Sequence, residues 1–429
     1  MLDTRYVFVV DSSASLFERG DDMNRPRRLL RGAIAAGLLV SVGGVTAVAS
    51  GTTEPAAGGE PIRVGVLLPD AGVYGQLGPD ITDGMNLYLD SVGREAGGRA
   101  IELVAEAEPQ DPNAALDAAR RLLDDDIDVL AGFVSTAAIY AARDLIDERG
   151  IPTIVSNAGG NELTAERFSE SIFRVSFTSN QVSAPFGTWV AENVGIKVAI
   201  VASDYAFGHE SAVAFTTTFE AAGGEIVEEV FTPLGSSDFS AAITQVASSD
   251  ADATFGFLAG SDGVIFVQQY ADAGISEDIP LTVAGFMTSS DVLDAVGDRA
   301  VGAISSLHYA PALDNPVNTE FVAAYEEAYG RTPSVYAAQG YDTAQYLVAA
   351  VEATGGDTSP EALIAALETA EIESPRGPVA MDADSHQVVQ HMYVREVQEV
   401  DGELVNVVIA DLGEVGPDPL VAAAPATTG

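Results

Sequence analysis

The chain has 429 residues, and its 64 acidic residues against 20 basic ones give a formal net charge of -44. Such a surface repels polyanions, which excludes nucleic acid and anionic membranes as partners. The absence of cysteine excludes disulfides, thiolate metal sites and a cysteine nucleophile. Molar salt, at which the Debye length is about 3 Å, would screen the repulsion among the carboxylates, so we predict a salt-adapted protein. Equal thermal stability in low and molar salt would contradict this prediction.

Residues 1–60 are predicted to be a leader, with an export signal at 23–49 and a flexible spacer after it. A cluster of arginines, including the pair Arg27 and Arg28, precedes a long uncharged run that ends in small residues. This order is typical of an export signal, and the arginine pair favours the twin-arginine route. Met23 is a better candidate for the start of translation than Met1. The alternative to a cleaved signal is a segment that stays on the protein as a membrane anchor. We expect the mature protein to be extracytoplasmic, at the cell surface or secreted.

Strand and helix patterns alternate after the leader. An apolar strand is predicted at Ile62–Leu68, followed by the glycine-rich loop Pro69–Pro79, a helix at Asp80–Val92 and a strand at Ile101–Ala105. The loop carries one aromatic residue, Tyr74. It can either reach a ligand at the end of the sheet or simply cover that end.

The stretch from Asp128 to Thr164 is predicted to be a strand, helix, strand crossover. Such a crossover requires parallel strands, so both of its loops lie at the carboxyl edge of the sheet, where open α/β sheets bind ligands. Free N–H groups at the start of the helix would face an anion, and a carboxylate is the expected ligand group. The alternatives are that Ser135 only caps its helix and that the second loop is an ordinary turn. The candidates from the two loops are Ser135, Thr136, Asn157, Ala158 and Gly159.

A second alternation begins near Lys197 and predicts a second parallel sheet. The loops at its carboxyl edge contribute aromatic residues and one carboxylate that could close over a small ligand. For Asp262 the alternative is an N-cap of the helix that follows. The candidates from these loops are Tyr205, Phe207, Asp262 and Phe286.

The fold class that these patterns predict is α/β, with two doubly wound parallel-sheet lobes. We assign residues 61–178 plus 312–385 to lobe 1 and residues 179–311 plus 386–412 to lobe 2. Three late helices should pack on lobe 1, and a hairpin should end the fold. Residues 413–429 are predicted to be a disordered tail.

Motifs for catalysis are missing from the sequence. It has no GxSxG, HExxH, Walker or GxGxxG pattern, and its four histidines show no metal spacing. Asp342 is a single carboxylate without a visible partner. We therefore expect no enzyme, no cofactor and no metal site.

An ordered set of segments resembles the type I periplasmic binding proteins of the branched-chain amino acid transport group. The likeness runs from about Ile62 to about Ile409 and includes GVLLPDAGVYGQLGPDITDGMNL, DVLAGFVSTAAIYAARDLIDERGIP, SNAGGNELT, DYAFG, FVQQYADAGI and YAAQGYDTAQYL. The resemblance implies two lobes joined by three crossings, a solute held between them and delivery to an ATP-driven permease. It also implies that the Ser135 and Asn157 loops hold the solute's carboxylate, while Tyr74, Tyr205 and Phe207 line the pocket.

Two departures from the family pattern bear on the ligand. Amino-acid binders of this group usually have a hydroxylic residue where Gly159 stands, and a glutamate for the ammonium where Val301 stands. An unpaired ammonium in a closed cleft is costly, so either Asp262 takes that role or the ligand has no ammonium. We predict a monomeric solute-binding protein of an ABC importer that captures a branched-chain amino acid or related carboxylate. The alternatives are a binder of aromatic or other organic acids, and a ligand sensor with the same fold.

Overall fold

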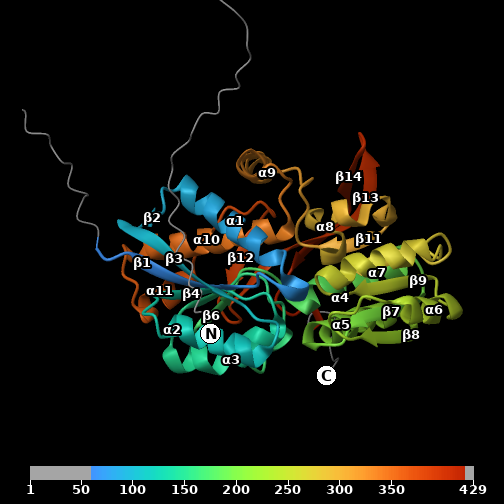
Figure 1. Cartoon of the computed structure of the whole chain (residues 1–429), viewed down its shortest axis with the longest axis horizontal. Helices are drawn as coiled ribbons and strands as arrows, with labels where there is room; N and C mark the ends of the chain where they lie inside the picture. The colour runs from blue at the N-terminus through green and yellow to red at the C-terminus, as the bar shows by residue number, and fades with distance from the viewer. Residues whose placement is uncertain (1–58, 421–429) are drawn as a thin grey trace, which may run out of the picture. The chain divides into compact units, whose positions relative to one another are not determined.

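The computed structural model describes residues 59–420, which form an α/β unit around a mostly parallel sheet (Figure 1). The predicted leader lies outside the described residues. The strands follow one hydrogen-bonded path in the order β2-β3-β1-β4-β5-β6-β13-β11-β10-β9-β7-β8, and β12 and β14 also pair with β13. Within residues 59–420 no helix has the length and apolar character needed to cross a bilayer.

The first half of the sheet comprises β1 to β6, and helices cover both of its faces. Its strands are β1 (Ile62–Leu68), β2 (Glu95–Ala96), β3 (Arg99–Ala107), β4 (Val129–Gly132), β5 (Thr153–Val155) and β6 (Ile172–Arg174). Its helices are α1 (Leu77–Ser91), α2 (Pro112–Leu123), α3 (Thr136–Arg149), α9 (Pro316–Tyr329), α10 (Val335–Thr354) and α11 (Pro360–Leu367). The late helices α9 to α11 pack on this half, as predicted.

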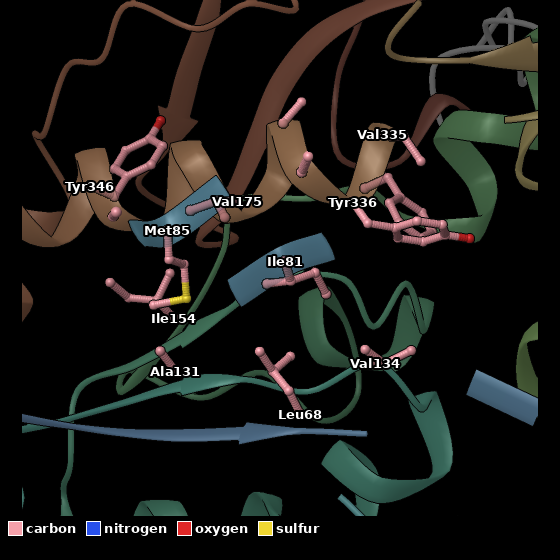
Figure 2. Packing of buried hydrophobic residues seen from close by; sticks show 14 of the residues in the cluster. Leu68, Ile81, Met85, Ala131, Val134, Ile154, Val175, Val335, Tyr336 and Tyr346 are labelled. Carbon is pink, nitrogen blue, oxygen red and sulfur yellow. The ribbon is translucent and has the colours of Figure 1, made fainter. Parts of the chain in front are cut away.

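Alternation along the buried strands explains the two layers of helices. Successive side chains point to opposite faces of a strand. Leu67 therefore packs with α2 and α3, whereas Leu68 packs with α1 and α10. Figure 2 shows Ile81 and Met85 of α1 between the strands and α10.

The second half repeats this plan with β7 to β11. Its strands are β7 (Lys197–Ser203), β8 (Glu225–Thr232), β9 (Ala253–Phe257), β10 (Leu281–Ala284) and β11 (Ile304–Leu307). Helices α4 (Ser179–Asn193) and α5 (Ala206–Ala221) pack against one face. Helices α6 (Ser240–Ser248), α7 (Ser261–Asp272) and α8 (Ser290–Val296) pack against the other. Short 3-10 turns are η1 (Gly72–Tyr74), η2 (Asn161–Thr164), η3 (Gly285–Thr288) and η4 (Gly297–Ala300).

Strand β13 (Gln387–Val400) connects the two halves. Its first residue pairs in parallel with Arg174 of β6, and its later residues run antiparallel to β11. The chain passes between the halves after β6, after β11 and at the entry to β13, which gives three passages. The predicted α/β class is confirmed.

The end of the chain differs from the prediction. The predicted terminal hairpin is present, and β12 (Val379–Asp382) adds a further short strand beside β13. However, β14 (Glu403–Val415) continues past the point where a disordered tail was expected. Thr178 Oγ1 donates to the carbonyl of Pro417, and Asn180 Nδ2 donates to Asp418. The tail prediction is therefore wrong for residues 413–418.

Candidate functional site

A pocket lies where the carboxyl ends of strands from both halves meet. Its empty volume, counted out into the open solvent at its mouth, is about 360 Å³. The residues that line it are Tyr74, Leu77, Val134, Thr136, Asn157, Gly159, Phe177, Tyr205, Phe207, Phe257, Ala259, Gly260, Phe286 and Tyr336.

The first half supplies the polar part of the wall. Thr136 is the first residue of α3, and Asn157 follows β5, so both lie at the predicted sheet edge. The side-chain amide of Asn157 donates to the carbonyl of Val134 at 3.3 Å. Its Oδ1 atom is buried and has no hydrogen-bond partner within residues 59–420. A ligand with a hydrogen-bond donor could satisfy this oxygen.

A carboxylate that the sequence did not reveal lies behind this wall. Glu108 follows β3, is buried, and accepts hydrogen bonds from the amides of Val134 at 2.7 Å and Ser135 at 2.8 Å. Burial raises the pKa of Glu108 to about 7, and the two amide donors oppose this rise. The amides of Val134 and Ser135, which were among those predicted to bind the solute, are therefore already bonded to Glu108. Its position at the end of a strand was the one available signal.

Aromatic rings form the opposite wall. The ring centroids of Phe207 and Phe257 are 4.7 Å apart, and those of Phe177 and Phe286 are also 4.7 Å apart. Phe177 meets Phe207 edge to face at 5.7 Å. Tilted and edge-to-face rings at these distances attract one another and are held in fixed orientations. The wall can therefore enclose a flat apolar group.

Gly159 lies where the polar wall meets the rings. A Cβ atom at this position would lie 2.3 Å from Phe177 and 2.5 Å from Phe207. Because those rings occupy the space, a hydroxylic side chain does not fit here. The departure from the amino-acid binders at this residue therefore has a steric reason.

Asp262 does not line the pocket. It is the second residue of α7, its side chain is buried, and Oδ2 accepts from the amide of Gly235 at 2.7 Å. Gly260 occupies the N-cap position, so the capping alternative is wrong. Gly260 has a φ of +51°, and a Cβ there would lie 2.1 Å from the carbonyl of Val73, which explains the glycine.

Val301 is half exposed and lines a different cavity beside Arg299. None of the residues that line the main pocket carries a formal charge. The described part of the chain also has no group of three or more acidic or histidine residues that could hold a metal ion. An ammonium group would therefore find no carboxylate in the pocket wall.

The structure brings together seven of the ten predicted site residues: Tyr74, Thr136, Asn157, Gly159, Tyr205, Phe207 and Phe286. Ser135, Ala158 and Asp262 are buried nearby without lining the pocket. Ser135 occupies the N-cap position of α3, but its side chain makes no capping hydrogen bond. Of the lining residues that were not predicted, Phe257 ends β9 and Ala259 and Gly260 follow it, so the edge rule could have found them. Phe177 follows β6, so the same rule could have found it, whereas Tyr336 lies in α10 and no strand end in the sequence predicts it.

Two parallel-sheet halves with a pocket between their carboxyl edges define a two-lobed solute-binding protein. The chain belongs to the periplasmic binding protein family, whose model matches residues 61–403. It is similar to Leu/Ile/Val-binding protein homolog 6 of Brucella melitensis, with 33% identity over 350 residues, covering 79% of this chain and 88% of that protein. The resemblance inferred from the sequence is confirmed.

Solved structures of ABC-transporter solute-binding proteins give the same result. One from Rhodopseudomonas palustris BisB5, in complex with 3,4-dihydroxybenzoic acid, is 36% identical with a TM-score of 0.80 and covers 84% of this chain and 99% of its own. Another from R. palustris, in complex with benzoate, is 35% identical with a TM-score of 0.79 and covers 83% and 97%. A leucine-binding protein from Thermotoga maritima, at 22% identity and a TM-score of 0.73, shares the fold. The chain is thus an ABC-transporter solute-binding protein, and its family implies an extracytoplasmic location and a membrane permease as partner.

Proposed function

We propose that this solute-binding protein captures a monocyclic aromatic acid, such as benzoate or a hydroxybenzoate, and delivers it to its permease as a monomer. The observation that carries the proposal is the composition of the pocket wall. Seven of its residues are aromatic, and none carries a formal charge. Such a wall suits a flat ring and offers no partner to an ammonium group.

The acid group of the solute is assigned to the first half. Thr136 offers a hydroxyl and stands at the N-terminus of α3, where the helix dipole favours negative charge. The loop around Gly159 brings backbone close to the same point. Glu108 holds the neighbouring amides of Val134 and Ser135, so the carboxylate is expected on the Thr136 side.

Closure of the second half would complete the site. Tyr205 and Phe207 stand at the start of α5, and Phe286 stands in η3 of the same half, so they contact the ring only when the halves approach. A solute that gains these contacts in the closed form shifts the population toward it. Affinity then depends on how well the ring fits the aromatic wall.

A branched-chain amino acid is the competing ligand class. Its ammonium would lose water without gaining a carboxylate, because Asp262 bonds to Gly235 and Glu108 bonds to two amides. A buried unpaired charge costs several kcal/mol, on the order of a hundredfold or more in affinity. The neighbours in complex with benzoate and dihydroxybenzoate support the aromatic class over this one.

Calorimetry on the purified protein with 4-hydroxybenzoate, benzoate, cyclohexanecarboxylate and leucine tests the proposal. We expect the two aromatic acids to bind at least 100-fold more tightly than leucine. Cyclohexanecarboxylate keeps the acid and the ring size but removes the π system, and we expect it to bind more weakly than benzoate. Leucine binding as tightly as benzoate would overturn the assignment.

A further inference from the structure

Glu210 of α5 joins the two halves beside the pocket but does not line it. Its Oε1 atom accepts from the hydroxyl of Tyr140 on α3 at 2.9 Å. Its Oε2 atom accepts from the amide of Asn161 at 2.8 Å and from the hydroxyl of Ser179 at 2.8 Å. Tyr140 and Asn161 belong to the first half, whereas Glu210 belongs to the second. One carboxylate therefore holds two donors from across the boundary between the halves.

Neighbouring bonds reinforce this link. Asn161 Nδ2 donates to Asn180 Oδ1 at 3.0 Å, and the amide of Asn180 donates back to Asn161 Oδ1 at 3.1 Å. The hydroxyl of Tyr140 also accepts from the amide of Glu162 at 3.0 Å. Hydrogen bonds to an ionised acceptor are stronger than those between neutral groups, so the carboxylate is the central member of this group.

The segment that Glu210 holds continues directly from the solute loop. Gly159 lines the pocket, and Asn161 is two residues further along the chain. Between them, the carbonyl of Gly160 accepts from Arg174 Nη1 at 2.5 Å. Arg174 is buried, and its charge lowers the pKa of Glu210 while burial raises it more strongly. The loop is thus held by a buried cation of the first half and by an anion of the second.

We propose that Glu210 is a latch that couples closure of the halves to the order of the solute loop at Gly159. When the halves separate, Glu210 leaves Tyr140 and Asn161, and the loop loses its bonds to the second half. When they close, the same carboxylate fixes the loop in its binding conformation. The proposal rests on the proposed function only in that this loop is taken to hold the solute's acid. Glu210 is a positioning residue in this account, because it acts through the loop.

The absence of cysteine from the chain allows a direct test. Dyes on Val92→Cys and Ile196→Cys report on one half each, since both side chains are exposed, at 36% and 57%. Single-molecule energy transfer then measures the closed fraction of the ligand-free protein. Tyr140→Phe and Glu210→Gln are expected to lower this fraction at least threefold. Ser179→Ala removes a bond to Glu210 within the second half and also one to the carbonyl of Gly159 at 3.1 Å, so we expect it to lower this fraction as well.

Tyr329→Phe is the matched control. It also removes one tyrosine hydroxyl, which donates to the carbonyl of Asp83 at 2.9 Å within the first half. We expect its closed fraction to equal that of the wild type. Equal closed fractions in the wild type and all variants would overturn the latch, and this includes the case in which none of the proteins closes. A loss of closed fraction in Tyr329→Phe equal to that in Tyr140→Phe would also overturn it. Melting curves of the same proteins establish that each variant is folded.

A second readout separates the latch from the proposed function. A threefold smaller closed fraction should weaken 4-hydroxybenzoate binding about threefold. If the wild type fails to bind this acid, the proposed ligand class is wrong, and the energy-transfer result still decides the latch. If the acid binds equally well to the wild type and to Tyr140→Phe, with equal closed fractions, the latch alone is overturned.

Discussion

The two walls of the pocket differ in how they are built. On the first-half side, Thr136 begins a helix and Asn157 and Gly159 stand in a loop, each after a parallel strand, and this wall presents backbone and small side chains to the pocket. On the second-half side, Phe207, Phe257 and other rings form a surface of large side chains. From this difference we expect the first wall to serve any carboxylate and the second to select the shape of the group that carries the carboxylate. Three predictions on binding test this division of roles, and a fourth concerns stability.

The largest effect is expected where the walls meet. Gly159→Ala should weaken binding of aromatic acids about 100-fold, because its Cβ would lie 2.3 Å from Phe177 and overpacking costs about 1–3 kcal/mol. Calorimetry measures the change. Gly416→Ala is the control, since nothing lies within 4 Å of a Cβ there.

A rescue variant shows whether sterics are the cause. Gly159→Ala combined with Phe177→Leu should recover much of the lost affinity, because the smaller side chain frees space at the closest contact. No recovery, together with an unchanged melting temperature, would mean that the glycine is needed for another reason.

Thr136→Ala should weaken every carboxylate solute about 30-fold, because a hydrogen bond to a charged group contributes about 1.5–3 kcal/mol. Benzoate and cyclohexanecarboxylate should lose affinity by the same factor. A loss of affinity for only one of these two acids would show that the first-half wall also distinguishes between their rings. Ser135→Ala is the companion variant, and we expect a smaller loss because Ser135 does not line the pocket.

Phe286→Ala should weaken aromatic acids about tenfold through the lost ring contacts. Its effect on cyclohexanecarboxylate should be clearly smaller, which is the reverse of the uniform loss expected for Thr136→Ala. Equal losses for both solutes would place the selectivity elsewhere in the wall.

The last prediction concerns folding stability and not binding, and it involves Glu108, which lies behind the first-half wall. Because burial raises the pKa of Glu108 from 4.5 to about 7, its stabilising contribution is present below about pH 4.5 and is lost as the pH rises through 7. The stability of Glu108→Gln relative to the wild type should therefore improve by up to about 3 kcal/mol between pH 4.5 and 7.5. Denaturant unfolding across this pH range measures the difference. A pH-independent difference would show that Glu108 titrates normally.

The sequence predicted half of the lining residues of each wall. Parallel strands end at one edge, so the loops at Thr136 and Asn157 could be placed from apolar runs and turn residues alone. Helix α5 begins at Ala206, and Tyr205 holds its N-cap position without a capping hydrogen bond. A helix start without a capping side chain leaves no local signal.

Contacts between residues far apart in the chain could not be predicted from the sequence. Asp342 appeared to have no partner, yet Arg376 donates to it at 2.7 Å and both side chains are fully buried. The bonds of Glu108 to two amides depend likewise on how two loops approach in space. Neither relation follows from spacing along the chain, because tertiary packing determines it.

Strand β13 carries a consequence for how the protein moves. It pairs with β6 at one end and with β11 further along, so both halves share this ribbon of backbone. A sliding displacement would break the ladder with β11, whereas torsion about the single Gln387 to Arg174 pairing leaves that ladder intact. We therefore expect the two halves to rotate relative to each other about an axis near Gln387. Substitutions there would alter how far the halves turn before they alter what the pocket recognises.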